Sequence, residues 1–121
     1  YWVLLGEGLI LKQKMTDDPT VVEEFSITRV TQGDSVFLAP GYGHLAINIG
    51  PTFFVTADDS PVRFDDPDPA GLPGHADYEP VRKTRGFAYY VIEQNGTPAL
   101  VRNTNYTEIK HEDLGGLPLY T

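Results

Sequence analysis

The chain has 121 residues, a length that suits one small domain and excludes a multidomain enzyme. Hydrophobic residues make up 40% of it, which is enough for a packed core and excludes disorder over most of its length. With 9 Lys and Arg against 17 Asp and Glu, the formal net charge of -8 disfavours nucleic acid and anionic membranes as partners. The chain lacks cysteine, a basic signal-peptide flank and a long apolar run, and we therefore expect a soluble, cytoplasmic protein.

Short runs rich in Val, Ile, Phe and Tyr alternate with Gly, Pro, Asn and Asp, and no window keeps apolar residues at helical spacing. The chain is therefore predicted to be all-β. In chain order, we expect strands at residues 1–5, 9–14, 21–29, 35–38, 44–49, 52–57, 86–93 and 99–103. Gly6 and Gly8 mark a turn after the first strand, and Asn95-Gly96 predicts a type I′ hairpin between the last two.

The strand at residues 44–49 has two different faces. Side chains alternate along a strand, so Leu45, Ile47 and Ile49 share the more apolar face. His44 lies on the other face, and we expect it to point into solvent or into the interior of a barrel.

The segment at residues 58–83 is dominated by Pro, Asp and Gly, and loops of this length in compact domains are usually functional or mobile. Its acidic residues, Asp58 and Asp59 among them, are predicted to form a solvated loop rather than a calcium site, because prolines interrupt any regular spacing. Residues 104–121 are weakly patterned and are predicted to form a tail that packs on a neighbour or frays.

The only basic cluster, Arg82, Lys83 and Arg85, precedes the strand expected from Gly86. A solvated turn is the favoured interpretation. Phosphate binding by one of these residues is the alternative, since the arginine fork suits phosphate oxygens.

Residues 33–48 have a distinctive order. A glycine turn leads into a short strand, Pro40 ends it, a glycine-rich corner follows, and the next strand starts with His44. This order resembles the second motif of the cupins, a superfamily of small β-barrels in which that histidine is a metal ligand. Further segments are similar in order to the cupin-type glucose-6-phosphate isomerases of archaea and some bacteria, over roughly residues 1–103: Ile47-Asn48-Ile49-Gly50, Gly74-His75 with Asp77-Tyr78, and Gly86-Phe87 before residues 91–96.

The resemblance implies a cupin-like antiparallel β-barrel or sandwich of the jelly-roll type. Residues 1–103 would be the C-terminal part of a cupin domain that lacks its N-terminal strands, and residues 104–121 a C-terminal tail. In that family two His and a Glu of the first motif, with one His of the second, hold one divalent ion of iron, nickel, manganese or zinc. His44 matches the last of these ligands, and we expect weak metal binding by this chain because one histidine does not make a metal site.

The resemblance also assigns substrate residues. Tyr1 matches a family tyrosine near the substrate phosphate. The alternative is that Tyr1 is simply an aromatic residue of a strand that packs in the core. His75 matches a histidine at the mouth of the active site and is the expected catalytic residue, with a plain loop histidine as the alternative. Ser60 stands where the family commonly has a substrate-contacting tyrosine, so one contact to the substrate is changed. His111 lies in the unmatched tail and is expected to be a surface residue.

The implied activity is the metal-dependent interconversion of glucose 6-phosphate and fructose 6-phosphate in glycolysis and gluconeogenesis, by a homodimer of the full-length parent, whereas this chain alone is expected to be inactive. The metal polarises the substrate oxygens while a proton or hydride moves between C1 and C2. The alternatives are a cupin that binds a sugar or sugar phosphate without turnover, and another cupin enzyme such as a different sugar isomerase or a dioxygenase.

Overall fold

The computed structural model describes residues 1–59 and 78–120. Strands make up about half of this part of the chain and the one helix in it has 4 residues, which confirms the all-β prediction. The elements, in chain order, are β1 (Trp2–Leu5), β2 (Glu7–Met15), β3 (Val21–Thr31), β4 (Gly43–Asn48), β5 (Val55–Ala57), α1 (Glu79–Arg82), β6 (Tyr89–Gln94), β7 (Thr97–Arg102) and β8 (Glu108–Asp113).

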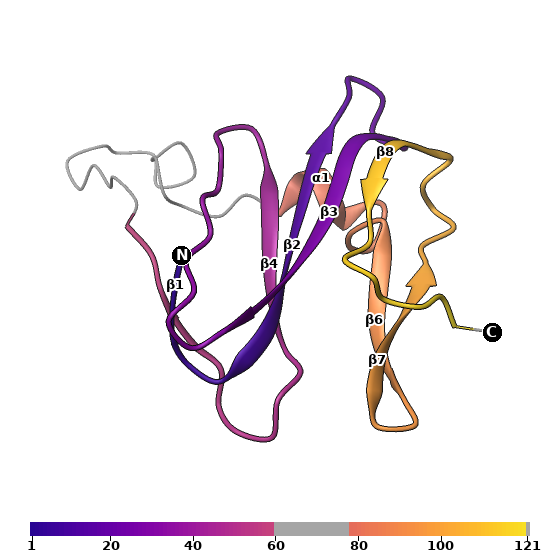
Figure 1. Ribbon diagram of the computed structural model, residues 1–121. Helices are drawn as coiled ribbons and strands as arrows, with labels where there is room; N and C mark the ends of the chain where they lie inside the picture. Colours follow the sequence, from indigo (N-terminus) through magenta and orange to yellow (C-terminus); the bar gives the residue numbers. More distant parts are fainter. Residues whose placement is uncertain (60–77, 121) are drawn as a thin grey trace.

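The largest sheet has the strand order β4-β2-β3-β8 (Figure 1). β2 lies between β3 and β4 and pairs with both in the antiparallel direction, whereas β8 runs parallel to β3. The parallel pair departs from the expected antiparallel pattern. It arises because residues 103–107 return the chain to the start of β3, where the amide of Thr107 donates to the carbonyl of Thr20 at 2.8 Å.

Two smaller sheets lie against this one. β1 pairs with β5 and β6 pairs with β7, and within the described residues the three sheets do not join into a closed barrel. Figure 1 shows β1 near the N-terminal end of the molecule and the β6–β7 hairpin on the side of the C terminus. No helix in the part of the chain that the structure describes is long and apolar enough to cross a membrane.

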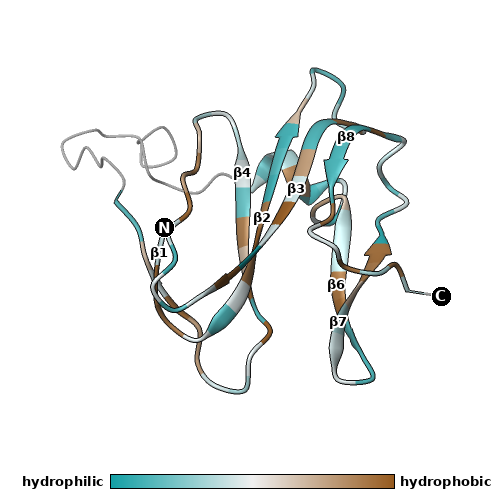
Figure 2. Cartoon of the chain, viewed as in Figure 1, coloured by the Kyte–Doolittle hydropathy of each residue, from teal (hydrophilic) through white to brown (hydrophobic). Residues whose placement is uncertain are grey.

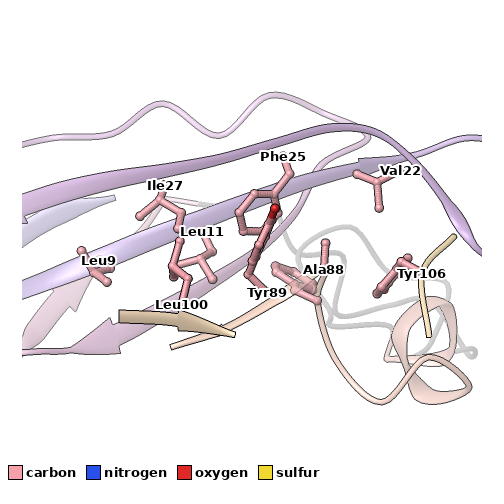
Figure 3. Packing of buried hydrophobic residues seen from close by; sticks show 10 residues of the cluster. Leu9, Leu11, Val22, Phe25, Ile27, Ala88, Tyr89, Leu100 and Tyr106 are labelled. Atoms are coloured by element: carbon pink, nitrogen blue, oxygen red, sulfur yellow. The ribbon is translucent and has the colours of Figure 1, made fainter. Parts of the chain in front are cut away.

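The strand alternation explains why the central sheet has a core on each face. Leu9 and Leu11 of β2 pack with the β6–β7 hairpin, whereas Ile10 between them packs with Val3 and Val30. The apolar residues of β2, at 9–11, are consecutive because they contribute to both cores, and the hydropathy changes along β2 in Figure 2. Figure 3 shows the larger core, in which the rings of Phe25 and Tyr89 are 5.2 Å apart between the sheet and the hairpin.

A buried polar network ties the turn before β6 to the central sheet. The Gln13 side chain donates to the Tyr106 hydroxyl at 3.0 Å and accepts from the Ala88 amide at 2.8 Å. The Asn103 amide donates to the carbonyls of Thr84 and Phe87 at 2.8 and 2.9 Å. No buried side-chain nitrogen or oxygen among the described residues lacks a hydrogen-bond partner, so this polar cluster is satisfied inside the core.

The predicted hairpin between β6 and β7 is confirmed. Asn95 and Gly96 have φ values of 53° and 79°, the two positive angles that a type I′ turn requires. Gly6, with φ of 88°, also bends the chain, but the chain passes from one sheet to another there instead of forming a hairpin, because β1 pairs with β5 and β2 with β3.

Three local predictions differ from the structure. Residues 35–38 do not form a full strand, because only Ser35 bridges to Trp2 and the chain soon reaches Pro40. The weakly patterned segment at residues 104–121 contains the strand β8, which was not predicted from the sequence. β8 lies at the edge of the sheet and is mostly exposed, so its residues are nearly all polar and show no apolar alternation. The turn before β6 contains the short helix α1, which starts with Pro80 in its first turn.

Tyr89 makes the stability sensitive to alkaline pH. Burial, with the 2.7 Å hydrogen bond that its hydroxyl donates to Glu112, raises the pKa of Tyr89 to about 12 from 10.0. The phenol is therefore harder to ionise in the folded chain, and its stabilising contribution is complete below pH 10 and is lost as the pH rises towards 12. Between these values, the free energy of unfolding should fall by about 1 kcal/mol per pH unit more in the wild type than in Tyr89→Phe.

This difference can be measured by urea unfolding at several pH values. Tyr90→Phe is the matched control, because Tyr90 is the next residue of β6 and is 40% exposed. Equal pH slopes for the wild type and Tyr89→Phe would contradict the prediction.

Candidate active site

The site is built on one face of the central sheet. His44 of β4 lies opposite Lys12 of β2, and Ala46 lies opposite Ile10. Residues that pair directly point to the same face of a sheet, and so do residues two apart in one strand. Ile10 packs with Val3 of β1, so Lys12 and its partner His44 lie on the face of the sheet that carries β1. Ile47 and Ile49 pack instead against the larger core on the opposite face. The structure thus places His44 away from the apolar face, as the alternation predicts.

Tyr1 and His44 are neighbours in space. The Tyr1 hydroxyl and His44 Nε2 are 2.9 Å apart, and the two rings meet edge to face with centroids 5.1 Å apart. The Tyr1 ring also packs against the smaller core of Val3, Ile10 and Val30. The ring of Tyr1 therefore packs on the core and its hydroxyl contacts His44, whereas the expected contact of Tyr1 with the substrate stays a prediction.

The surroundings keep both groups uncharged at neutral pH. Burial raises the pKa of Tyr1, and the nearby charge of Asp58 raises it further. Burial lowers the pKa of His44, and Asp58 opposes this effect only in part. At pH 7 the pair is a phenol hydrogen-bonded to a neutral imidazole, which can act as a hydrogen-bond donor, a proton acceptor or a metal ligand.

Tyr1 and His44 line a cleft of about 270 Å³. The segment at residues 36–42 also lines this cleft, as do Asp58 and Asp59. A second cleft of about 150 Å³ adjoins it, because Phe37, Ala39 and Tyr42 line both. The remaining residues of the second cleft are Lys12, Glu24 and Ser26.

The corner before His44 is held by side chains of the central sheet. Gly41 has φ of 86°, a conformation that favours glycine, and the Tyr42 hydroxyl donates a hydrogen bond to Glu24. The Lys14 ammonium lies 5.9 Å from the centre of the Tyr42 ring. These contacts fix the wall that the two clefts share and the point at which β4 begins.

The described residues do not form a complete metal site. Among residues 1–59 and 78–120, no three His, Cys, Asp or Glu side chains lie close enough together to hold an ion. Of the histidines that the structure describes, His44 is the one that lines either cleft. It could supply one ligand, so the metal inferred from the sequence stays a prediction and no chemical step can be assigned to it here.

The other residues singled out in the sequence fall into two groups. Ser60 and His75 lie outside the described residues. His111 is exposed on β8, and the basic cluster of Arg82, Lys83 and Arg85 is exposed beside α1; none of these four lines a cleft. Arg82 forms an ion pair with Glu79 at 2.9 Å.

The sequence pattern missed two contributions to the clefts. Asp58 and Asp59 are exposed, as expected of a solvated loop, but they also border the cleft of Tyr1 and His44. Lys12 was hidden in an apolar strand, and only the pairing of β2 with β4 places it across from His44. The signal that could have found it is the pair of charged residues, Lys12 and Lys14, on the side of the strand opposite to Leu9 and Leu11.

Comparisons with known proteins give one match. No curated protein and no solved structure matches the chain. A family model described as "Glucose-6-phosphate isomerase (GPI)" matches residues 1–109, which include Tyr1, Lys12, His44 and both clefts. Since this match covers most of the 121 residues, the chain belongs to the glucose-6-phosphate isomerase (GPI) family.

Proposed function

We propose that this chain provides the substrate cleft of an enzyme that interconverts glucose 6-phosphate and fructose 6-phosphate. The observation that carries the proposal is the family match over residues 1–109. The Tyr1–His44 pair supports it, because the pair places two uncharged polar groups 2.9 Å apart in a cleft of about 270 Å³. A cleft of this size suits part of a sugar phosphate.

The reaction moves hydrogen between C1 and C2 of the sugar and shifts the carbonyl from one carbon to the other. Groups that hold the two oxygens in place lower the barrier by orienting the substrate. We assign Tyr1 to substrate contact, because its phenol stays protonated at neutral pH and can donate to an oxygen of the bound sugar.

The remaining roles are proposals from the family resemblance. We propose His44 as one ligand of a divalent ion of iron, nickel, manganese or zinc, with the other ligands from outside the described residues. Such an ion would polarise the carbonyl oxygen of the substrate. We propose His75 as the catalytic residue and Ser60 as a substrate contact. The homodimer, the cytoplasmic location and a place in glycolysis and gluconeogenesis also stay predictions.

The test is the reaction itself. The whole protein that contains this chain is incubated with fructose 6-phosphate and excess manganese, iron, nickel or zinc in turn, and the formation of glucose 6-phosphate is followed by NMR. We expect glucose 6-phosphate to form at a rate proportional to the protein concentration. Binding of fructose 6-phosphate without turnover under every condition would contradict the proposal and favour a sugar-phosphate-binding protein instead. Turnover of other substrates alone would favour a different enzyme of the superfamily.

A further inference from the structure

The turn between β6 and β7 carries an asparagine side chain that no contact holds in place. Asn95 and Gly96 are the two residues of this turn, and both are exposed. Figure 1 shows the turn at the outer end of the hairpin, and a Cβ added to Gly96 would have nothing within 4 Å. Within the described part of the chain, the Asn95 side chain makes no hydrogen bond and the Gly96 amide donates none.

The other three asparagines of the chain are held by hydrogen bonds. Asn103 is 2% exposed, and its side chain donates to two backbone carbonyls at 2.8 and 2.9 Å. The Asn48 side chain donates one hydrogen bond to the backbone at 2.8 Å and accepts another at 2.9 Å. Asn105 donates to a backbone carbonyl at 3.1 Å. None of these three is followed by glycine, so Asn95 alone combines a glycine neighbour with a side chain that is free to move.

This combination favours a reaction between the two residues of the turn. The amide nitrogen of Gly96, after it loses its proton to hydroxide, can attack the side-chain carbonyl carbon of Asn95 and form a cyclic imide, while Nδ2 takes up a proton and leaves as ammonia. Glycine favours this attack because it has no Cβ to obstruct it. The rotation that brings the two atoms together breaks no hydrogen bond of either group.

Water completes the reaction by opening the imide at one of its two C–N bonds. One opening gives aspartate, and the other gives isoaspartate, in which the main chain runs through the former side chain. The net change converts an amide and a water molecule into a carboxylate and an ammonium ion. No oxidant, reductant or enzyme is required.

We propose that Asn95 is a site of spontaneous deamidation, at which Gly96 displaces the side-chain nitrogen. The two products differ in their effect on the hairpin. Aspartate suits the same turn, because Asp-Gly favours the type I′ conformation as Asn-Gly does. Isoaspartate adds one methylene to the main chain of a turn in which Gln94 pairs with Thr97 across only two residues, and it therefore disturbs this pairing.

The hairpin covers the larger core, so a change in its turn affects the stability of the chain. Val91 and Leu100 pair across the hairpin; Leu100 is buried in the larger core, and Val91 packs against it. Isoaspartate at position 95 should loosen this pair, whereas aspartate should not. The turn lines neither cleft, so this inference does not depend on the proposed function.

The test compares the whole protein that contains this chain in native buffer and in urea, both stored at the same mildly alkaline pH. Peptides from the two samples are analysed by mass spectrometry, with a fragmentation method that distinguishes aspartate from isoaspartate. In the native sample, we expect the peptide of Asn95 to gain the mass of one deamidation and the peptides of the other three asparagines to stay unchanged. The inference is overturned if Asn95 stays unchanged in the native protein until most of it has reacted in urea. Equal reaction of all four asparagines in the native protein would also overturn it.

Asn95→Asp is the matched control for the effect on stability. It carries the charge of both products but keeps a main chain of normal length. We expect its urea midpoint to stay near that of fresh wild-type protein, whereas the stored protein that contains isoaspartate should unfold at lower urea. If the stored protein unfolds at the same urea concentration as Asn95→Asp, the turn accepts the longer main chain and the inferred loosening of the hairpin is wrong.

Discussion

Replacing His44 by Gln should reduce the rate of isomerisation by about a thousandfold, in line with the loss of a group that acts directly on the reacting atoms or holds a catalytic ion. His44 is the only histidine that lines either cleft among the described residues, and its hydrogen bond to Tyr1 at 2.9 Å fixes the orientation of both side chains. Gln keeps a polar amide of similar reach but cannot supply an imidazole nitrogen. The rate is measured with fructose 6-phosphate and the most effective of the four ions.

His111→Gln is the matched control for this substitution. It removes a histidine from β8, where the side chain is exposed and lines neither cleft, and the rate should stay within about twofold of the wild type. Tyr1→Phe should cost about tenfold, because it removes one hydroxyl and keeps the ring that packs on the smaller core. If His44→Gln keeps the wild-type rate of isomerisation, or if His111→Gln lowers the rate as much as His44→Gln does, His44 has no specific role in the reaction.

The sequence predicts the parts of this site that depend on local pattern. The alternation in β4 places His44 on the face away from the large core, and the motif from Gly33 to His44 indicates the corner that precedes it. Asn95-Gly96 predicts its hairpin because the turn needs two positive φ angles, which is a property of two adjacent residues.

The remaining features depend on which strands become neighbours. Lys12 faces His44 only because β2 lies between β3 and β4, and a strand pattern does not specify its partners. The parallel pairing of β8 with β3 follows from the path of residues 103–107 around the hairpin, and the edge position of β8 leaves little hydrophobic alternation to detect. Asp58 reaches the cleft because β5 pairs with β1, which also brings Tyr1 there.

That pairing of β1 with β5 depends on Gly6, and Gly6→Ala should lower the free energy of unfolding by about 3 kcal/mol or more. Gly6 has φ of 88°, and an added Cβ would lie 2.3 Å from the carbonyl oxygen of Phe53. The obstacle is backbone, so it cannot rotate away. Either β1 or the chain before β5 must move, and the pairing of Trp2 with Ala57 is then disturbed.

Substitutions at two other glycines distinguish the cost of a steric conflict from the cost of backbone strain. Gly33 has φ of 94° and nothing within 4 Å of an added Cβ, so Gly33→Ala should cost only the strain of the left-handed conformation, about 1 kcal/mol. At Gly8 an added Cβ would lie 2.2 Å from the Phe54 ring, a side chain that a second substitution can shorten. Phe54→Leu should therefore recover part of the stability lost in Gly8→Ala, whereas Phe53→Leu should recover none of the loss in Gly6→Ala.

Urea unfolding measures all of these variants with two probes. Trp2 is the single tryptophan and lies in β1, so its fluorescence reports on the pairing with β5, whereas circular dichroism reports on all the strands. If Gly6→Ala only loosens β1, the fluorescence transition should move to lower urea than the dichroism transition; if it destabilises the whole chain, the two should move together. If both probes show that Gly6→Ala loses no more free energy of unfolding than Gly33→Ala, the backbone at Phe53 can move away from the added Cβ at little cost. The close approach of Phe53 to Gly6 would then not be what brings Tyr1 and Asp58 to the same cleft.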